Sequence, residues 1–283
     1  NAILGVSLAV AVAAAKSASQ PLYAYLRDIF HAGLGHDQYV LPVPMVNIVN
    51  GGVHADSNLD FQEFIILPLS AKKFPDAIRM ASEVFHALGD VLHKVHLATN
   101  VGNEGGYATT FIGHTHVFDL VMQAIESAGY KPGKDIYLGI DAAASEFYKT
   151  GRYHLNSEKV VLDRDQMMVY YRDLIKKYPL ISIEDPLDQN DWEGWAAFTK
   201  RFREKIQIVG DDLFVTNVER IEKGIQKKVA NAVLIKPNQI GTLSETIDAI
   251  RMSSDAGYRS VISHRSGDTG DTFIADLAVA MDT

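Results

Sequence analysis

The sequence predicts an α/β protein built on parallel strands, and two observations lead to this prediction. First, short runs of apolar, often β-branched residues recur along the chain, which is typical of buried strands. They end at positions 141, 184, 211, 236 and 264, so the last four ends are 27, 25 and 28 residues apart. Second, a helical pattern fills each of these intervals. Such a repeat is typical of an α/β barrel or an open parallel sheet.

Each of these five strands ends in at least one ionisable side chain. The residues are Asp141, Glu184 with Asp185, Asp211 with Asp212, Lys236, and His264 with Arg265. Packing gives no reason for this pattern, because a buried charge is costly unless it is paired or bound to a metal. In parallel α/β folds the carboxyl ends of the strands are where sites are built. We therefore expect the functional site at this edge.

The N-terminal part of the chain predicts a helical segment followed by two strands. Residues 2–15 are apolar and alanine-rich. They are too few to cross a membrane, which takes about 20 residues, and they lack the basic start of a signal peptide. We expect a buried helix here. Two prolines within 41–44 indicate a connector. Strands are then predicted at 45–49 and 61–67.

The remaining elements follow from apolar spacing and from glycine positions. A 3.6-residue period predicts a helix over 75–94, and Gly129 ends a second helix over 118–128. The glycine-rich loop 101–106 separates them. A hairpin is predicted around Thr150-Gly151-Arg152. The helices that alternate with the later strands are predicted at 165–178, 192–202, 218–227, 243–255 and 271–281.

Composition narrows the class of protein. The 283 residues are 47% hydrophobic and 22% charged, which is ordinary for a globular chain of one large domain or a domain plus a fragment. The net charge of −8 argues against nucleic acid as the main partner. It leaves a small anionic substrate open, because a local cationic site can outweigh the overall field. The absence of cysteine excludes disulfides, thiol nucleophiles and cysteine-based zinc sites, and is consistent with a reducing cytoplasm.

Three strand-end carboxylates suggest a metal site. Asp141, Glu184 and Asp211 follow consecutive strands and would repel one another unless a cation held them. An all-oxygen set favours Mg²⁺ or Mn²⁺ over zinc. The alternative is three independent helix caps or loop salt bridges, which Asp and Glu often form.

Lys236 ends the apolar run Val-Leu-Ile-Lys. A nearby cation would lower the pKa of this lysine, so that it could remove a proton from carbon. The alternative is a lysine that is simply paired with Asp211 or Asp212. The neighbouring strand end offers His264, Arg265 and Ser266, a set that suits phosphate or carboxylate binding.

A second group of candidates lies in the earlier loops. Glu104 stands among glycines and could act as a general acid. Glu63 could be its partner, since two close carboxyl groups can share a proton. His54 could line the same cavity. The alternative for each is an ordinary surface or capping residue.

Several motifs together resemble the enolase family. They are Asn50-Gly-Gly-Val-His54, Gln62-Glu63-Phe64, Ile183-Glu-Asp-Pro186, Gly210-Asp-Asp-Leu213, Lys236-Pro-Asn-Gln-Ile-Gly-Thr242 and Ser263-His-Arg-Ser-Gly267. The resemblance is to bacterial-like enolases and runs from end to end. It implies an α/β fold, an enolase-type (β/α)8 barrel in ββαα(βα)6 order that lacks its last strand. It also implies two domains, a remnant of the N-terminal α+β capping domain over 1–40 and the catalytic barrel over 41–283.

The resemblance also implies an activity, namely the Mg²⁺-dependent, reversible dehydration of 2-phosphoglycerate to phosphoenolpyruvate in glycolysis, a hydro-lyase reaction. It implies Lys236 as the base and Glu104 as the acid, with Glu63 beside the acid. The other implied roles are Mg²⁺ binding by Asp141, Glu184 and Asp211, phosphate contacts by Arg265 and Ser266, and substrate contacts by His54, Glu63 and His264.

The chain departs from the family pattern in three places. Asn103 stands where the family usually has Asp before the glutamate of the glycine loop, residues 107–116 diverge, and the loop after Ser266 carries fewer acids. We also expect a chain that is truncated at both ends, without the family's second active-site lysine and serine loop. The isolated chain is therefore expected to be impaired.

Two other functions stay open at this point. One is another acid dehydratase or racemase of the enolase superfamily, and the other is a non-catalytic structural or surface-binding relative. We expect a cytoplasmic protein with a small-molecule substrate, homo-oligomeric at full length, without a nucleic-acid partner or a membrane span. A secondary surface or secreted location is left open.

Overall fold

The computed structural model describes residues 1–30 and 38–283, which divide into two compact units. Unit 1 consists of Asn1–Pro42 and Val209–Thr283, and unit 2 consists of Val43–Ile208. Each unit is described by itself below. The capping-domain remnant predicted over 1–40 includes residues 31–37, which lie outside the described residues.

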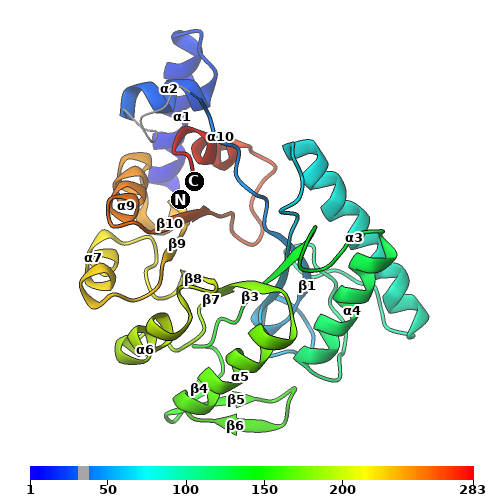
Figure 1. Ribbon diagram of the computed structural model, residues 1–283. Coiled ribbons are helices and arrows are strands. Elements are labelled where there is room, and N and C mark those ends of the chain that lie inside the picture. Colours follow the sequence, from blue (N-terminus) through cyan, green and yellow to red (C-terminus); the bar gives the residue numbers. More distant parts are fainter. Residues whose placement is uncertain (31–37) are drawn as a thin grey trace. The chain divides into compact units, whose positions relative to one another are not determined.

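Unit 2 begins with the ββαα order that the sequence predicts (Figure 1). Its first elements are β1 (Val46–Asn50), the 3₁₀ turn η1 (Gly52–His54), β2 (Glu63–Leu67), α3 (Phe74–Lys94), α4 (His114–Ser127), β3 (Tyr137–Asp141) and β7 (Leu180–Glu184). Strand β2 pairs antiparallel with β1 and with β3, and β3 pairs parallel with β7. The carboxyl ends of β3 and β7 therefore lie at one edge of this sheet.

A small second sheet in unit 2 holds the predicted hairpin. It consists of β4 (Tyr148–Lys149), β5 (Arg152–Leu155) and β6 (Val160–Leu162), and the chain continues into α5 (Arg164–Lys177) and α6 (Trp192–Phe202). Thr150 and Gly151 both have positive φ, as a two-residue hairpin turn of the primed type requires. Figure 1 shows the three strands beside α5. The hairpin prediction is confirmed, whereas β6 was not predicted.

The core of unit 2 is aromatic. Phe61, Phe64, Tyr171 and Phe198 are among its largest fully buried or nearly buried side chains. The rings of Phe61 and Tyr171 are stacked at 6.0 Å, and Tyr171 meets Phe198 edge to face at 5.5 Å. Large rings bury much apolar area and prefer such offset or edge contacts. This cluster packs α5 and α6 against the strand side of the unit.

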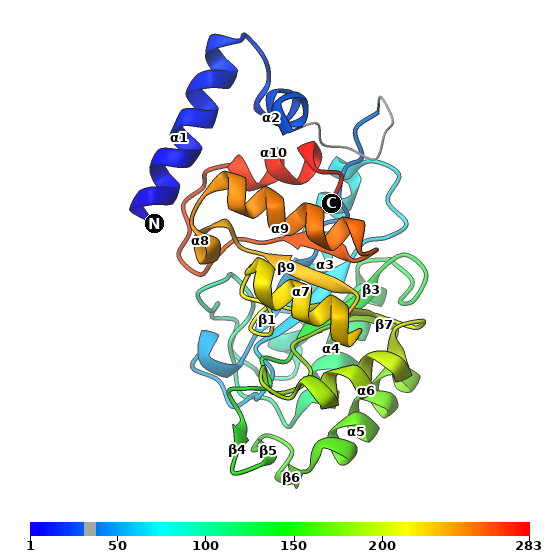
Figure 2. The same ribbon diagram turned by 90° about the vertical axis from the view of Figure 1, so that its left-hand side faces the viewer.

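Unit 1 contains the regular part of the predicted repeat. Its elements are α1 (Ala2–Ser17), α2 (Leu22–Phe30), the end of β8 (Gln207–Gly210), α7 (Val218–Lys227), β9 (Ala232–Ile235), α8 (Pro237–Ile240), α9 (Leu243–Asp255), β10 (Arg259–Ile262) and α10 (Phe273–Ala280). Strand β9 pairs parallel with β8 and with β10. Helix α10 packs on α2 and on β10 (Figure 2). The parallel arrangement predicted from the strand spacing is confirmed.

The predicted burial of the first helix is wrong, although the helix itself is present. In α1 only Ala11 and Ala15 are buried, while Ile3, Val6 and Val10 are well exposed. Within unit 1 this helix contacts α2 and α9 along a narrow strip. A helix that is apolar all round needs neighbours on every side to be buried. The apolar composition of α1 therefore predicts more burial than its contacts within unit 1 provide.

Among the described residues, no single helix has both the length and the hydropathy needed to cross a membrane. Helices α1 and α2 meet those criteria only as a pair, which is bent by 101° at the break between them.

Most other predicted bounds agree with the structure to within two residues, and one helix start differs more. Helix α4 begins at His114, four residues before the predicted start. Its first turn carries no Ser, Thr, Asp or Asn cap, which is the usual signal for a helix start. Instead the Glu158 carboxylate accepts the backbone N–H of His114 at 2.6 Å. The cap thus comes from residue 158, which local sequence does not reveal.

Candidate active site

Three of the predicted acids meet at the strand ends of unit 2. Asp141 is the last residue of β3 and lies opposite Glu184, the last residue of β7, in the parallel pair. Glu63 begins β2 and lies opposite Asp141 in the antiparallel pair. Because β2 runs in the opposite direction, its first residue falls at the same edge as the last residues of β3 and β7. The neighbouring positions of Asp141 and Glu184 agree with the predicted metal set, whose third member, Asp211, belongs to unit 1.

The carboxylate of Asp141 is buried and held in one orientation. It accepts hydrogen bonds from Gln62 Nε2 and from the backbone N–H of Ala143, both at 2.9 Å. Glu184 is also buried. Carboxylate oxygens are the hard donors that suit Mg²⁺, so the chemistry of these two side chains is compatible with a divalent cation.

A second cluster in unit 2 contains the candidate acid. His54 Nδ1 lies 2.9 Å from Glu104 Oε2 and 3.8 Å from Glu63 Oε1. Ligand atoms of the three side chains all lie within 4.8 Å of one another. His54 ends η1, Glu63 begins β2, and Glu104 stands in the loop between α3 and α4. The prediction that these residues line one site is consistent with this geometry.

The loop that carries Glu104 is a tight turn closed by its own backbone. Gly102 N–H donates to Gly106 O at 2.8 Å, and Gly105 N–H donates to Gly102 O at 3.1 Å. Gly105 has a φ of +85°, which favours glycine. The glycines of the loop thus place Glu104 at the tip of the turn.

In unit 1 the candidate base lies against a candidate metal ligand. Asp211 follows β8 and Lys236 follows β9, and Lys236 Nζ forms an ion pair with Asp211 Oδ2. The other carboxylate oxygen, Oδ1, accepts from Gln239 Nε2 at 3.3 Å. The predicted alternative of a lysine paired with Asp211 agrees with this contact. A paired amine and a carboxylate at adjacent strand ends also agree with a base beside a metal ligand.

Thr216 fixes the backbone beneath that pair. Its Oγ1 accepts the backbone N–H of Lys236 at 2.9 Å and lies 3.0 Å from Gln239 Oε1 as a donor. Thr216 is fully buried and has positive φ, an uncommon conformation for a β-branched residue. Sequence reasoning missed Gln62, Thr216 and Gln239. Gln62 and Gln239 lie within two of the motifs that resemble the enolase family, whereas Thr216 carries no such signal.

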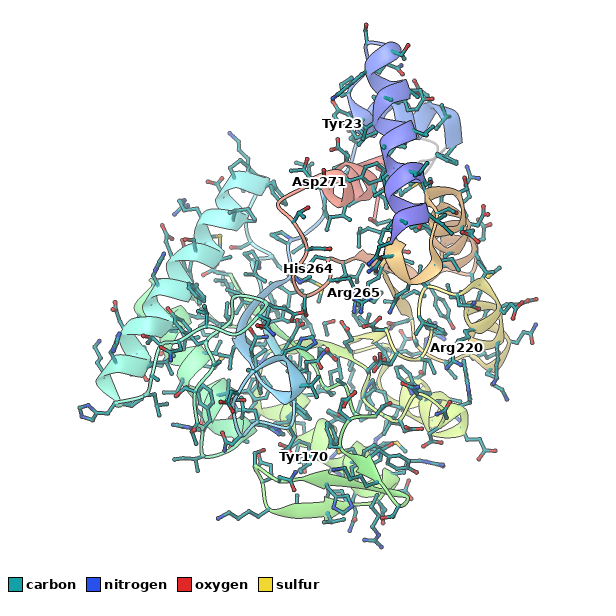
Figure 3. The ribbon with its side chains drawn as sticks, turned by 180° about the vertical axis from the view of Figure 1, so that it is seen from behind. Tyr23, Tyr170, Arg220, His264, Arg265 and Asp271 are labelled. Carbon is teal, nitrogen blue, oxygen red and sulfur yellow. The ribbon has the colours of Figure 1, made fainter. Side chains whose placement is uncertain are left out.

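The third group of candidates lies on the loop after β10. His264, Arg265 and Ser266 are exposed there. Figure 3 shows the side chains of His264 and Arg265 on the loop that leads to α10. Arg265 N–H donates to Asp268 Oδ2 at 2.9 Å, and its Nη1 donates to Asn238 Oδ1 at 3.3 Å. An exposed guanidinium beside an imidazole and a hydroxyl suits an anionic group.

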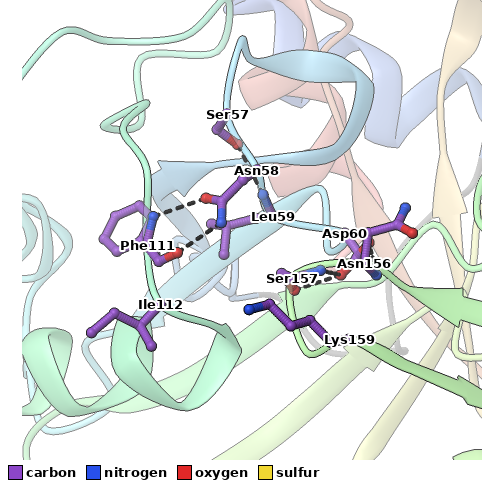
Figure 4. A pocket seen from close by; sticks show the side chains of 9 residues that line it. All are labelled: Ser57, Asn58, Leu59, Asp60, Phe111, Ile112, Asn156, Ser157 and Lys159. Carbon is purple, nitrogen blue, oxygen red and sulfur yellow. Dashed lines mark hydrogen bonds between the residues drawn. The ribbon is translucent and has the colours of Figure 1, made fainter.

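A separate pocket of about 580 Å³ in unit 2 contains none of the predicted site residues (Figure 4). It is lined by Ser57, Asn58, Leu59, Asp60, Phe111, Ile112, Asn156, Ser157 and Lys159. The Asn58 side chain donates to Phe111 O at 2.7 Å and accepts Phe111 N–H at 2.8 Å. This pair of bonds joins the loop after His54 to the segment after Glu104.

Parallel strands with ionisable residues at their carboxyl ends define an α/β-barrel protein of the kind that builds its site at that edge. Comparison with known proteins supports the same class of protein. The family model described as "Enolase, C-terminal TIM barrel domain" matches residues 38–283. The enolase of Mycobacterium leprae (strain TN) is 54% identical over 282 residues, which is 99% of this chain and 64% of that protein. The chain belongs to the enolase family, and it spans about two thirds of the length of this relative.

These findings confirm the family resemblance and the α/β barrel fold class. The predicted site residues fall into two groups. Unit 2 holds His54, Glu63, Glu104, Asp141 and Glu184, and unit 1 holds Asp211, Lys236, His264, Arg265 and Ser266. The structure joins His54, Glu63 and Glu104 in one cluster, pairs Asp141 with Glu63 and Glu184 across neighbouring strands, and pairs Lys236 with Asp211, whereas His264, Arg265 and Ser266 lie on a separate loop of unit 1. Their individual roles, and the domain boundary at residue 40, stay predictions.

Proposed function

We propose that this chain carries the catalytic barrel of an enolase, a hydro-lyase that interconverts 2-phosphoglycerate and phosphoenolpyruvate in glycolysis. The observation that best supports the proposal is the contact between Lys236 and Asp211 at neighbouring strand ends. Packing does not explain a lysine at the end of a buried strand, because a buried charge is costly. The amine of Lys236 lies against Asp211, one of the three proposed Mg²⁺ ligands.

The difficult step is removal of a proton from carbon next to a carboxylate. Lys236 Nζ takes this proton, and it can do so only as the neutral amine. Asp141, Glu184 and Asp211 would hold Mg²⁺, which would supply positive charge to the substrate carboxylate. Gln62 and Gln239 keep the carboxylates of Asp141 and Asp211 in orientation through the bonds described above.

The second step is loss of hydroxide from the neighbouring carbon. Glu104 supplies the proton that turns this leaving group into water. His54 and Glu63 hold its carboxyl group in place, since all three side chains converge. Arg265, Ser266 and His264 bind the phosphate through charge-assisted hydrogen bonds.

The remaining expectations extend this proposal. The protein is cytoplasmic, Mg²⁺ is its cofactor, and the full-length form is a homo-oligomer. Residues 1–40 are the end of a capping domain, and 41–283 form the catalytic barrel.

Substitution of the base tests the proposal directly. We expect Lys236→Ala to lower turnover of 2-phosphoglycerate by at least about 100-fold, because general-base catalysis typically contributes 10²–10⁴-fold. Mg²⁺ binding, measured by calorimetry, should persist. Lys200→Ala, which removes an exposed lysine of α6, is the matched control and should leave both unchanged. Turnover that survives in Lys236→Ala would assign the base elsewhere.

A non-catalytic relative is the second candidate, and Asn103 favours it. This residue replaces the acid that the family usually carries next to Glu104. A non-catalytic relative need not bind metal, so a Mg²⁺ titration that shows no binding would support it. Activity on non-phosphorylated acids would instead support another dehydratase of the superfamily.

A further inference from the structure

Asn50 occupies a central position among the residues around the proposed acid. It is the last residue of β1 and is fully buried. Across the β1–β2 pair it lies opposite Glu63, and it precedes His54 by four residues. It also touches the loop that carries Glu104, as shown next. Asn50 is therefore linked to Glu63 by the strand pair, to His54 by a short stretch of chain, and to the Glu104 loop by hydrogen bonds.

Two hydrogen bonds join Asn50 to the end of the Glu104 loop. Asn50 Oδ1 accepts the backbone N–H of Gly106 at 2.9 Å, and the backbone N–H of Asn50 donates to Tyr107 O at 3.0 Å. Tyr107 N–H in turn donates to Ile48 O at 2.9 Å. The loop thus ends as an extension of β1, and the amide of Asn50 fixes where it ends.

The two glycines at the base of the loop lie directly against Asn50. A Cβ at Gly102 would be 2.9 Å from both Cβ and Oδ1 of Asn50. A Cβ at Gly106 would be 2.9 Å from the backbone N and Oδ1 of Asn50. Neither position has room for a side chain. The loop therefore rests on this asparagine at both of its ends.

The other atom of the amide shows why asparagine is used. Asn50 Nδ2 is buried without a hydrogen-bond partner in the described part of the chain, and an unsatisfied buried donor is costly. Aspartate would accept from Gly106 equally well and would leave no such donor. It would, however, place a negative charge beneath Glu104 and raise the pKa of that carboxyl group. The amide supplies the acceptor and stays neutral.

We propose that Asn50 is a positioning residue for Glu104, which it holds through Gly106 without adding charge to the site. This inference rests on the proposed function, in which Glu104 is the acid. Asn50 itself touches no reacting atom. It acts on the reaction through the place and the protonation of Glu104.

Three variants of the 283-residue chain test the proposal. Asn50→Ala removes the acceptor, Asn50→Asp keeps it and adds charge, and Asn58→Ala removes a similar pair of backbone bonds at Phe111 as the control. Three signals are measured: exchange of the Gly106 amide, the ¹⁵N shifts of the His54 ring, and the pH profile of kcat/KM for 2-phosphoglycerate.

In Asn50→Ala we expect faster Gly106 exchange, altered His54 shifts and a loss of about 100-fold in kcat with little change in KM, because misplacement by about 1 Å can cost that much. In Asn50→Asp we expect Gly106 to stay protected. The basic limb of the profile, where the acid loses its proton, should move to higher pH. Asn58→Ala should leave Gly106 exchange and the pH profile unchanged.

Unchanged Gly106 exchange and His54 shifts in Asn50→Ala would overturn the proposal, and these two signals need no turnover. Release of Gly106 without any change in kcat or in the pH profile of an active enzyme would also overturn it, since Asn50 would then be merely structural. A wild-type chain that binds Mg²⁺ but never turns over 2-phosphoglycerate would contradict the proposed function instead. The exchange and shift data would still decide whether Asn50 holds the loop.

Discussion

His114 shows how strongly burial can act on a single residue. Its ring is fully buried and stacks on Phe61 at 3.9 Å, and its Nδ1 lies 2.9 Å from the Tyr170 hydroxyl. Asp60 and Glu158 approach its nitrogens at 3.7 Å and 3.5 Å. Burial nevertheless lowers the pKa of His114 to about 3. The ring is therefore neutral, and its close approaches to the two acids are not ion pairs.

This depressed pKa makes the stability of the fold depend on pH. Between about pH 6.5 and 3 the unfolded chain binds a proton at His114 that the folded chain does not. Stability is thus full above the unfolded pKa and falls with pH by about 1.4 kcal/mol per unit from this group. We expect the stability difference between wild type and His114→Gln to change by about 2 kcal/mol between pH 7 and pH 5.

Urea unfolding at the two pH values measures this change, and His93→Gln, at an exposed histidine, serves as the control. A wild-type-minus-variant difference that is the same at both pH values would show that His114 is protonated in the folded chain.

At the residue scale the sequence predicts charged site residues better than neutral ones. Asp141 and Glu184 were located because a charge at the end of an apolar strand has no packing explanation. Asn50 and Gln62 were missed because a neutral amide at a strand end reads as an ordinary loop residue. Their importance depends on partners that are distant in sequence, Gly106 and Asp141. Only the fold supplies those partners.

At the element scale, helix α7 contains Gly224, although glycine is unfavourable in the interior of a helix. A Cβ at Gly224 would collide with the Phe214 ring, whose Cζ would be 2.8 Å away. We expect Gly224→Ala to destabilise the protein by about 1–3 kcal/mol, as overpacking does. Gly5→Ala in α1, where nothing lies within 4 Å of the new Cβ, should instead stabilise by about 0.5–1 kcal/mol.

Thermal and urea unfolding of the two alanine variants give this comparison. If both variants gained stability, the contact between Gly224 and Phe214 would not restrict α7.

Elements were predictable where the signal is local. Helix α5 begins at a capping box of Asp163 and Gln166, and α7 and α9 begin at Asn217 and Thr242, so their bounds agree closely with prediction. Strand β6 was missed because it has only three residues, too few for an alternating pattern to be recognised. The predicted burial of α1 was wrong because it was based on composition alone. The burial of a helix depends on the elements that pack against it, which composition does not reveal.

At the scale of the whole molecule, unit 1 is assembled from both ends of the sequence. Arg27 of α2 donates to Ala280 O at 3.3 Å and to Val279 O at 3.1 Å, and it pairs with Asp282. Tyr23 N–H also donates to Asp276 Oδ1 at 3.2 Å. A cation that binds the last carbonyls of a helix satisfies groups that have no partner within the helix. Arg27 thus joins α2 to the end of α10.

We expect Arg27→Met, which keeps an apolar side chain but removes the charge, to destabilise unit 1 by about 1–3 kcal/mol, because buried acceptors lose their donor. Hydrogen exchange should rise together in 22–30 and 273–283 and stay unchanged in 43–208. Arg172→Met, at an arginine that pairs with the adjacent Asp173, is the control. A uniform rise over the whole chain would mean that the two units do not open separately.

The discontinuity of unit 1 has a consequence for synthesis on the ribosome. Residues 43–208 are contiguous in the sequence, whereas residues 1–42 leave the ribosome before them and have their partners in unit 1 only from Val209 onward. At roughly 5–20 residues per second, the apolar helix α1 waits on the order of ten seconds for these partners. During that time its apolar side chains are exposed on the nascent chain, and we expect chaperones to bind them.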